Sequence, residues 1–320
     1  MEEVKKKVLI STNDVPQIGI DLLRAEYNTT VNDVNTKASL VDKVPGVSAL
    51  FWSTKVKLDV DILNAAGPQL EVVAAMSAGL DNIDVEELKR RNIKLSNTPG
   101  VLNAAVADIA VLLALAASRR LREGQMHIQN NTWAPNLRWM LGKDLKGSTV
   151  GIVGLGEIGK AIVKRLKAFE VHKFVYCGRA EKPEGKELGA EFVTFDDLLS
   201  RSDFVIASCP LMPETKEMFD ETAFKKMKST SIFVNIGRGG LVDQAALVKA
   251  LKENTIFAAG LDVMVPEPLP SDHELVQLPN CFLSPHLGSA TQQTRSDMAR
   301  LAAQNVIAAL SGEKLITPVY

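Results

Sequence analysis

Short apolar runs alternate with amphipathic stretches along the first third of the chain. The apolar runs have the length of buried β-strands and fall at Val8–Ser11, Ala49–Ser53, Val72–Ala75 and Ile93–Ser96. The stretches between them space their apolar residues as helices do, at Ile18–Glu26, Val60–Ala66 and Val85–Arg91. This alternation is typical of a parallel sheet covered by helices, and it predicts a small α/β unit.

A second alternating series predicts a larger unit. Its strands are expected near Val150, Phe174, Phe192, Phe204, Ile232, Phe257 and Phe282. A long apolar helix over Val101–Leu121 precedes the series, and a last helix over Ser289–Leu310 follows it and should return to the first unit. We therefore predict two doubly wound parallel-sheet domains. Residues 1–103 and 289–320 would form a flavodoxin-like substrate domain, and residues 104–288 a Rossmann cofactor domain.

Glycines mark the start of the second series. Gly154, Gly156 and Gly159 have the G-x-G-x-x-G spacing between an apolar strand, Thr149–Val153, and a helix, Lys160–Phe169. In a dinucleotide fold the first glycine permits the turn, the second admits the pyrophosphate and the third lets helix pack on strand. The phosphates then lie against the helix N-terminus. We expect Glu157 and Ile158, between the glycines, to border the cofactor as well.

The end of the next strand predicts which dinucleotide binds. Domains specific for NAD commonly place a carboxylate about 20 residues beyond the glycines, where it binds the ribose 2′-hydroxyl. This chain has Gly178, Arg179 and Ala180 there, after the strand Lys173–Cys177. A guanidinium suits phosphate oxygens, so the sequence favours NADP(H) over NAD(H). A solvated surface arginine is the alternative.

Three charged residues follow late strands of the second series. Arg238, Glu267 and His286 each follow an apolar strand, where ligands bind in open α/β sheets. Each alone is an ordinary loop residue. Together they form a set that could reduce a 2-oxo acid: arginine binds the carboxylate, histidine protonates the carbonyl oxygen, and glutamate orients the imidazole and favours its charged form.

These motifs, in this order and across essentially the whole chain, resemble those of the D-isomer-specific 2-hydroxyacid dehydrogenases. The matching segments beyond the glycines are Asn235–Gly239, Gly260–Val263, Glu267-Pro268 and Ser284–Thr291. The resemblance implies that Arg238, Glu267 and His286 are catalytic. Within the family the chain looks most like the glyoxylate/hydroxypyruvate reductases, because of Glu267–Pro270, Gly178-Arg179 and the segment Trp133–Gly142. That likeness implies NADPH-dependent reduction of glyoxylate and hydroxypyruvate to glycolate and D-glycerate.

The resemblance also implies roles for residues that spacing alone does not single out. Ala78 and Gly79 would hold the substrate carboxylate through backbone N–H groups, although an ordinary strand-to-helix turn is the alternative. Asp262, Ser289 and Trp139 would also border the substrate, Trp139 from the partner subunit of a homodimer or as a plain interface residue. The remaining implied cofactor contacts are Pro210, Ile236 and Gly288.

Composition limits the partners and the cellular compartment that we expect for this protein. The formal net charge is −1 over 320 residues, without a long run of one sign, so neither nucleic acid nor a membrane surface is expected as a partner. Cys177, Cys209 and Cys281 are unclustered, which favours reduced thiols in the cytoplasm and gives no metal-binding spacing. A 3-phosphoglycerate dehydrogenase remains an alternative within the enzymes. A dinucleotide-sensing corepressor or scaffold is the alternative outside them.

Overall fold

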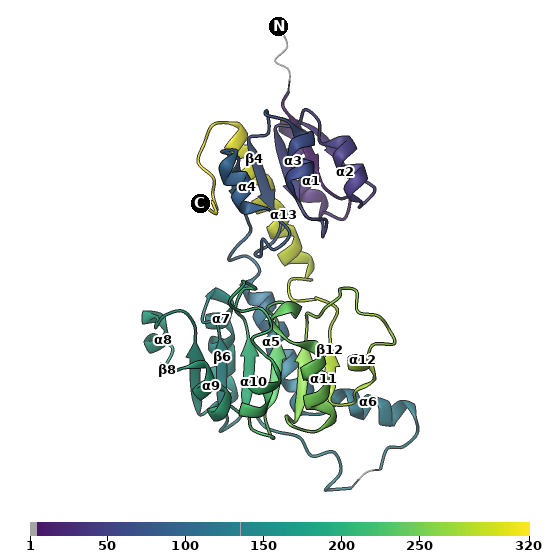
Figure 1. Cartoon of the computed structure of the whole chain (residues 1–320), viewed down its shortest axis with the longest axis vertical. Coiled ribbons are helices and arrows are strands. Elements are labelled where there is room, and N and C mark those ends of the chain that lie inside the picture. The colour runs from purple at the N-terminus through teal and green to yellow at the C-terminus, as the bar shows by residue number, and fades with distance from the viewer. Residues whose placement is uncertain (1–4, 135) are drawn as a thin grey trace. The chain divides into compact units, whose positions relative to one another are not determined.

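The computed structural model describes residues 5–134 and 136–320, which fold into two compact units (Figure 1). The first comprises Met1–Leu102 and Ala290–Tyr320, and the second comprises Asn103–Ser289. These boundaries lie one residue from the predicted ones. Asn103 belongs to the second unit because helix α5 (Asn103–Ser118) already begins there.

The first unit is built on a five-stranded parallel sheet with strand order β2-β1-β3-β4-β5, the flavodoxin-like order. Its strands are β1 (Lys7–Ile10), β2 (Asn28–Val31), β3 (Ala49–Trp52), β4 (Val72–Ala75) and β5 (Lys94–Ser96). Helices α1 (Gln17–Glu26) and α13 (Gln292–Leu310) pack together on one face. The other face is covered by α2 (Lys37–Lys43), α3 (Val60–Ala66) and α4 (Val85–Arg90). The last helix thus returns to the first unit, as predicted.

Two elements of this unit were not predicted, β2 and α2. Strand β2, Asn-Thr-Thr-Val, lies at the sheet edge, pairs only with β1 and has no fully buried residue. Helix α2 has seven residues and buries only Leu40. Edge strands and short surface helices need few apolar residues, so the apolar pattern that reveals the central elements is missing from both.

The second unit contains a seven-stranded parallel sheet with strand order β12-β11-β10-β9-β6-β7-β8. Its strands are β6 (Thr149–Val153), β7 (Lys173–Cys177), β8 (Ala190–Phe192), β9 (Phe204–Ala207), β10 (Ile232–Asn235), β11 (Ala258–Leu261) and β12 (Cys281–Leu283). The chain runs outward from β6 to β8 and then resumes on the other side with β9. This reversal is the switch point of a Rossmann sheet, and ligands bind at the carboxyl ends of the strands beside it.

Helices cover both faces of the larger sheet (Figure 1). One face carries α5 and α7 (Glu157–Leu166), and the other carries α9 (Phe195–Arg201), α10 (Glu221–Lys226) and α11 (Gln244–Lys252). The remaining helical elements are α6 (Leu121–Gln129), α8 (Pro183–Glu187), α12 (Glu274–Gln277) and the 3₁₀ turns Lys167–Phe169 and Gly239–Leu241.

Three helices differ from the prediction at their ends. The expected helix over Val101–Leu121 is broken, because Arg120 adopts a left-handed φ of 54° between α5 and α6. Helix α7 begins at Glu157 rather than Lys160, so Gly159 lies within it. Helix α13 begins at Gln292 rather than Ser289, because the Thr291 hydroxyl caps it by accepting from the Thr294 amide.

Helix α5 is rich in Ala, Leu and Val and packs on β10, β11 and β12. Most of its apolar residues lie in the protein interior, as expected for a helix of a doubly wound fold, whereas Leu112 is 49% exposed. Among the described residues, no helix is both long enough and apolar enough to cross a membrane.

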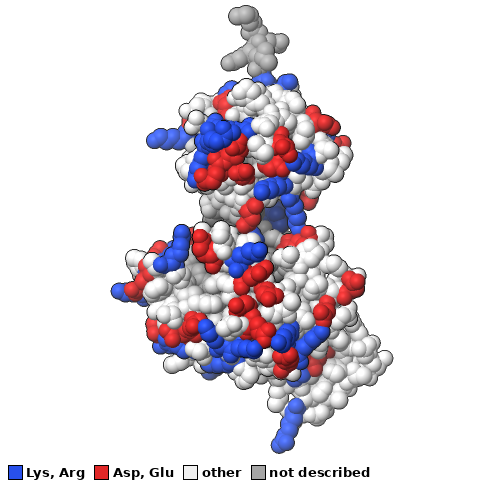
Figure 2. Space-filling view, in the orientation of Figure 1, with Lys and Arg blue, Asp and Glu red and all other residues white. Residues whose placement is uncertain are grey.

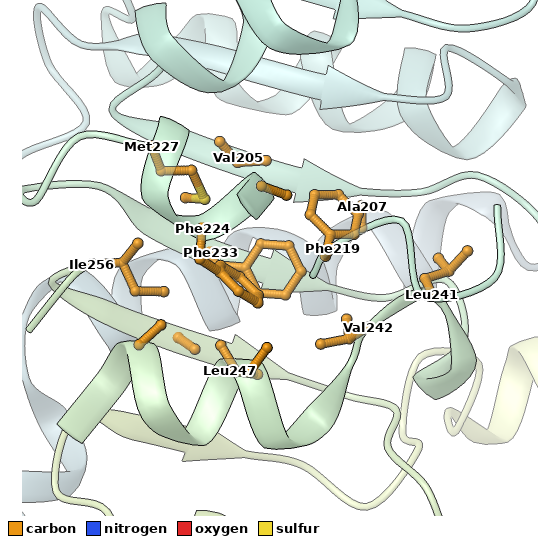
Figure 3. Close-up of a cluster of buried hydrophobic side chains, with 14 of the residues drawn as sticks. Val205, Ala207, Phe219, Phe224, Met227, Phe233, Leu241, Val242, Leu247 and Ile256 are labelled. Atoms are coloured by element: carbon orange, nitrogen blue, oxygen red, sulfur yellow. The ribbon is translucent and has the colours of Figure 1, made fainter. Parts of the chain in front are cut away.

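An aromatic cluster consolidates the face covered by α9, α10 and α11 (Figure 3). Phe233 of β10 lies with its ring centroid 4.7 Å from that of Phe219 and 5.5 Å from that of Phe224 on α10. All three rings are almost fully buried. Each such ring contributes a large apolar area, so the cluster anchors α10 on β10. The loops that follow these strands carry part of the site described below.

Candidate active site

The three glycines of the β6–α7 turn differ in their surroundings. Gly154 has a φ of +95°, and a Cβ added there would lie 2.8 Å from the Cys209 backbone. A Cβ on Gly159 would lie 2.5 Å from the Gly154 carbonyl oxygen. At Gly156, by contrast, a Cβ would meet no described atom within 4 Å. Turn geometry and packing therefore require glycine at positions 154 and 159. Gly156 instead leaves open space where a pyrophosphate can approach.

Helix α7 begins directly at this open space. Gly156 is its N-cap and has no side chain to satisfy the first amides of the helix, which is ten residues long. Glu157 and Ile158 form its first turn. Unsatisfied N–H groups and the helix dipole together favour an anion at this end. The arrangement fits a dinucleotide diphosphate.

A cavity of about 960 Å³ lies at the carboxyl ends of β6, β7 and β9. Of the predicted cofactor residues, those lining it are Gly154, Gly156, Gly178, Arg179, Ala180 and Pro210. Glu157, Ile158, Gly159, Ile236 and Gly288 do not line it. Lys182 and Thr194 do line it and were not predicted. The cavity accommodates a nucleotide in size. The loop after β7 contributes Arg179 and Lys182 to its lining, where NAD sites typically have a carboxylate, and Glu214 lines it from the loop after β9.

Two thiols face this cavity. Cys177 ends β7 and Cys209 follows β9, and both line the cavity wall. Burial raises the pKa of Cys177 to about 12 and that of Cys209 to about 11. Both are therefore neutral, weakly reactive thiols near pH 7.

The loop that carries Arg238 is shaped by Asn235, the fully buried last residue of β10. The Asn235 side chain accepts a hydrogen bond from the Gly237 amide (3.0 Å) and donates one to the Arg238 carbonyl oxygen (2.9 Å). One side chain thus closes the turn in two places. The Asn-Ile-Gly-Arg-Gly sequence was recognised as a family motif, but this role of its asparagine was not foreseen.

Glu267 and His286 are in direct contact. The Nδ1 atom of His286 lies 2.8 Å from Oε2 of Glu267, and Oε1 of the same carboxylate accepts from the Met264 amide at 3.2 Å. Because an ionised carboxylate only accepts hydrogen bonds, Nδ1 carries the proton in this contact. Nε2 is the atom left to meet a substrate. The glutamate side chain is 21% exposed and the imidazole 44%, so the ring reaches solvent while its partner is sheltered.

Asp262, predicted to border the substrate, organises the histidine loop. Its Oδ1 accepts from the Ser284 hydroxyl and from the Leu287 amide at 2.7 Å, and its Oδ2 accepts from the Gly288 amide at 2.8 Å. The carboxylate is 2% exposed. His286 itself has a left-handed φ of 56° and donates its amide to the Asp262 carbonyl oxygen. Asp262 therefore fixes the backbone conformation that presents the imidazole.

These loops form one continuous surface at the carboxyl edge of the sheet. A Cβ on Gly239 would lie 2.3 Å from the Met264 backbone, and one on Gly237 would lie 2.9 Å from the Cys209 carbonyl oxygen. The Arg238 loop thus contacts the loop leading to Glu267 on one side and the wall of the nucleotide cavity on the other. The predicted catalytic residues share one edge with the cofactor cavity. Ser289 ends this unit and is partly buried.

Ala78 and Gly79 belong to the other unit and follow β4. Their carbonyl oxygens accept hydrogen bonds from the side chains of Asn97 (2.9 Å) and Ser77 (2.6 Å). Asp84, rather than Asp81 or Asn82, caps α4 by accepting from the Glu87 amide. The turn is thus held through its carbonyls and is not the N-cap of the helix that follows.

Trp139 lies in the segment between α6 and β6. Its ring packs edge-on against His127 of α6, with the ring centroids 5.1 Å apart. The same segment contains strongly exposed apolar residues, including Trp133 (63%), Leu137 (98%) and Leu141 (63%). Monomeric proteins rarely leave such a group open to water, so this segment has the character of an interface.

The switch-point cavity, the glycine turn and the hydrogen-bonded His286–Glu267 pair at one sheet edge are typical of nicotinamide-dinucleotide-dependent dehydrogenases. The family model for the D-isomer specific 2-hydroxyacid dehydrogenase NAD binding domain matches residues 111–288. The chain belongs to the D-isomer-specific 2-hydroxyacid dehydrogenase family, and it is an enzyme of the class that reduces 2-oxo acids.

The names of similar proteins agree with this family assignment. The chain is 45% identical to the glyoxylate reductase/hydroxypyruvate reductase of Mus musculus over 286 residues, 89% of this chain and 87% of the relative. It is 44% identical to the glyoxylate reductase of Thermococcus onnurineus over 319 residues, 97% and 94% of the two chains. Among solved structures, the NADPH-dependent glyoxylate/hydroxypyruvate reductase of Sinorhizobium meliloti, in complex with NADP and malonate, matches with a TM-score of 0.88, 32% identity and coverage of 98% and 97%.

Proposed function

We propose that this protein catalyses the NADPH-dependent reduction of glyoxylate and hydroxypyruvate to glycolate and D-glycerate. The 2.8 Å contact between His286 and Glu267, at the edge that carries the nucleotide cavity, is the observation on which the proposal mainly rests. The names of the relatives at 44–45% identity support the choice of substrates.

Each charged residue has a distinct task in the proposed reaction. When bound, the reduced nicotinamide supplies the hydride that adds to C2 of the oxo acid. Arg238 binds the substrate carboxylate and draws electron density toward the carbonyl oxygen. His286 donates the proton on Nε2 to that oxygen as negative charge develops there. Glu267 holds Nδ1, so the ring keeps its orientation and presents Nε2 to the substrate.

Residues outside this set complete the substrate site in the proposal. The Ala78 and Gly79 amides hold the carboxylate end of the substrate, and Ser289 borders it. Trp139 covers the site of the partner subunit in a homodimer. The exposed apolar residues around Trp139 support that assembly. The cytoplasm is the proposed compartment, because all three cysteines are free.

NADPH is the proposed reductant because Gly178 and Arg179 line the mouth of the nucleotide cavity. A glycine at this position removes the carboxylate that would repel a 2′-phosphate, and the guanidinium attracts one. The Sinorhizobium meliloti reductase, which is NADPH-dependent and was solved in complex with NADP, supports the same choice.

A panel of substrates and cofactors tests the proposal. Turnover of glyoxylate, hydroxypyruvate, pyruvate and phosphohydroxypyruvate is measured with NADPH and with NADH. We expect the highest kcat/KM for glyoxylate or hydroxypyruvate with NADPH. A preference for phosphohydroxypyruvate would instead identify a 3-phosphoglycerate dehydrogenase. Dinucleotide binding without turnover of any oxo acid would favour a sensor or scaffold.

Substitution of Arg179 tests the cofactor preference directly. Arg179→Ala should raise the KM for NADPH about tenfold or more and leave that for NADH nearly unchanged, since only a charged contact to the 2′-phosphate is lost. Arg24→Ala, at an exposed position on α1, is the control. If Arg179→Ala keeps the parental preference, Arg179 is a surface residue and the NADPH assignment is wrong.

A further inference from the structure

The loop that carries Arg179 is exposed, yet it is held at its far end. Residues 178–182 connect β7 to α8 and are all exposed. An exposed loop of this kind would ordinarily lose considerable conformational entropy on binding a phosphate, which weakens binding. Two contacts fix this loop beforehand.

The first contact is made by Tyr176, one residue before the end of β7. The Tyr176 hydroxyl accepts a hydrogen bond from the Lys182 amide at 2.8 Å and donates one to the Lys182 carbonyl oxygen at 3.3 Å. The ring is only 1% exposed, and it packs against Phe192 with 5.3 Å between centroids. It also packs so closely on Gly185 that a Cβ there would lie 2.6 Å from the ring. A rigid, buried ring thus holds both backbone polar groups of Lys182.

The second contact joins the loop to the diphosphate end of the site. The Lys160 ammonium on α7 lies 2.7 Å from a Glu157 carboxylate oxygen and 3.1 Å from one of Glu184. Glu157 opens α7 beside the glycine turn, and Glu184 lies in α8 two residues after Lys182. The Lys160 side chain is only 17% exposed, so this bridge is partly sheltered from water. It links the start of α7 to α8, the helix that follows the loop.

Lys182 and Arg179 line the same cavity. A ribose 2′-phosphate carries nearly two negative charges at neutral pH, and one guanidinium neutralises only one of them. We propose that Lys182 is a second cationic ligand of the 2′-phosphate, and that the Tyr176 hydroxyl is the positioning group that keeps Lys182 beside Arg179. This inference rests on the proposed preference for NADPH and names further residues that would produce it.

Two small ligands separate this role from catalysis. Adenosine 2′,5′-bisphosphate carries the 2′-phosphate, and adenosine 5′-monophosphate lacks it, so calorimetric titration with both measures the phosphate site without any turnover. Lys182→Ala should weaken binding of the bisphosphate about tenfold and change that of the monophosphate less than about twofold. Tyr176→Phe keeps the ring and removes the hydroxyl, and should weaken the bisphosphate selectively by about threefold to tenfold.

Enzyme kinetics give a second readout. Both variants should raise the KM for NADPH and leave kcat with saturating NADPH, and the KM for NADH, close to the parental values. Lys186→Ala is the matched control for Lys182, because Lys186 lies on the helix that follows Lys182, is 80% exposed and does not line the cavity. Tyr27→Phe is the matched control for Tyr176, since its hydroxyl also bonds a backbone carbonyl, that of Ile307, in the other unit.

The outcomes distinguish this inference from the proposed function. If the parent enzyme binds both ligands equally, the NADPH preference itself fails and the inference fails with it. If the parent prefers the bisphosphate and Arg179→Ala abolishes the preference, but Lys182→Ala and Tyr176→Phe do not alter it, only the inference is overturned. Equal loss of both ligands in Tyr176→Phe would assign the hydroxyl a purely structural role. Should Tyr176→Phe fail to fold, Lys182→Ala still decides whether the second cation exists.

Discussion

The two ring nitrogens of His286 have different surroundings. Nδ1 faces the carboxylate of Glu267 at 2.8 Å, and Nε2 is left for the substrate. His286→Ala should lower kcat by about 10²–10⁴-fold, the usual contribution of a general acid, and leave NADPH affinity unchanged. Steady-state turnover and a fluorescence titration with NADPH measure the two quantities.

A second histidine serves as the control for this substitution. His172 is exposed and lies before β7, away from the acid–base pair, so His172→Ala should retain parental turnover. Near-parental kcat in His286→Ala would remove His286 from the reaction. A loss of NADPH binding equal to the loss of kcat would show that the loop, rather than the acid, had been damaged.

The two cavity thiols should be poor nucleophiles despite their exposure to the cofactor site. With its pKa raised to about 11, only about one Cys209 in a thousand is a thiolate at pH 8. Labelling of Cys209 by iodoacetamide should therefore be slow at pH 8, accelerate as pH rises toward that pKa, and be suppressed by NADPH. Mass spectrometry of labelled peptides measures it, with Cys177 as the more deeply buried comparison. Rapid labelling at pH 8 would contradict this picture.

Hydrogen bonds from side chains to the backbone account for most of what the sequence could not reveal about the site. The positions of Arg238, Glu267 and His286 in loops after apolar strands could be predicted, because charged residues there stand out from the apolar pattern, and their catalytic roles stay predictions. The tasks of Asn235 and Asp262 were not, since a side chain that shapes a loop leaves no periodic or charge pattern. Lys182 was missed for a related reason: its place in the cavity depends on the Tyr176 hydroxyl, six residues away along a loop.

At the scale of the elements, apolar runs revealed the strands that are buried on both faces. Strand β3, Ala-Leu-Phe-Trp, is fully buried and was predicted almost to the residue. The edge strand β2 was missed because exposed and half-buried residues alternate along it and none is fully buried. The start of α7 was placed too late because glycines usually indicate loops. Gly159 lies inside this helix, and its lack of a side chain lets α7 pack closely on β6.

The glycine turn gives an element-scale prediction with an internal control. Gly159→Ala would place a methyl group 2.5 Å from the Gly154 carbonyl oxygen, so α7 must shift away from β6, and we expect a loss of about 1–3 kcal/mol in stability. Gly156→Ala meets open space at an ordinary φ of −81°, and should change stability by less than about 0.5 kcal/mol.

For NADPH affinity we expect the opposite order from that for stability, with the larger effect at Gly156. The methyl group of Gly156→Ala would occupy the space through which a pyrophosphate approaches, so NADPH affinity should fall about tenfold or more while the folded apoprotein remains stable. Thermal unfolding without ligand and calorimetric titration with NADPH measure both effects. Equal stability losses at the two positions would mean that the open space at Gly156 is filled in the folded protein.

On the face shown in Figure 2, acidic and basic residues are interspersed over much of each unit. The region of α6 and the segment that follows it is largely uncharged in that view. The exposed apolar side chains there are Leu121, Ile128, Trp133, Leu137 and Leu141. Exposed apolar side chains gathered in one segment commonly belong to a subunit interface, so the whole-molecule prediction is a homodimer.

Light scattering should therefore give twice the chain mass of 34.7 kDa. Replacing Leu137 and Leu141 together by Asp introduces two charges into the proposed interface and should shift the protein toward a monomer, whereas Val34→Asp, at a half-exposed position in the first unit, should not. If Trp139 reaches the partner's site, the monomeric variant should also bind oxo acid more weakly while retaining its NADPH affinity. Trp139→Ala should reproduce that rise in the KM for the oxo acid without dissociating the dimer. If the parent is a monomer, or if the monomeric variant keeps the parental KM for the oxo acid, each active site is formed by a single chain.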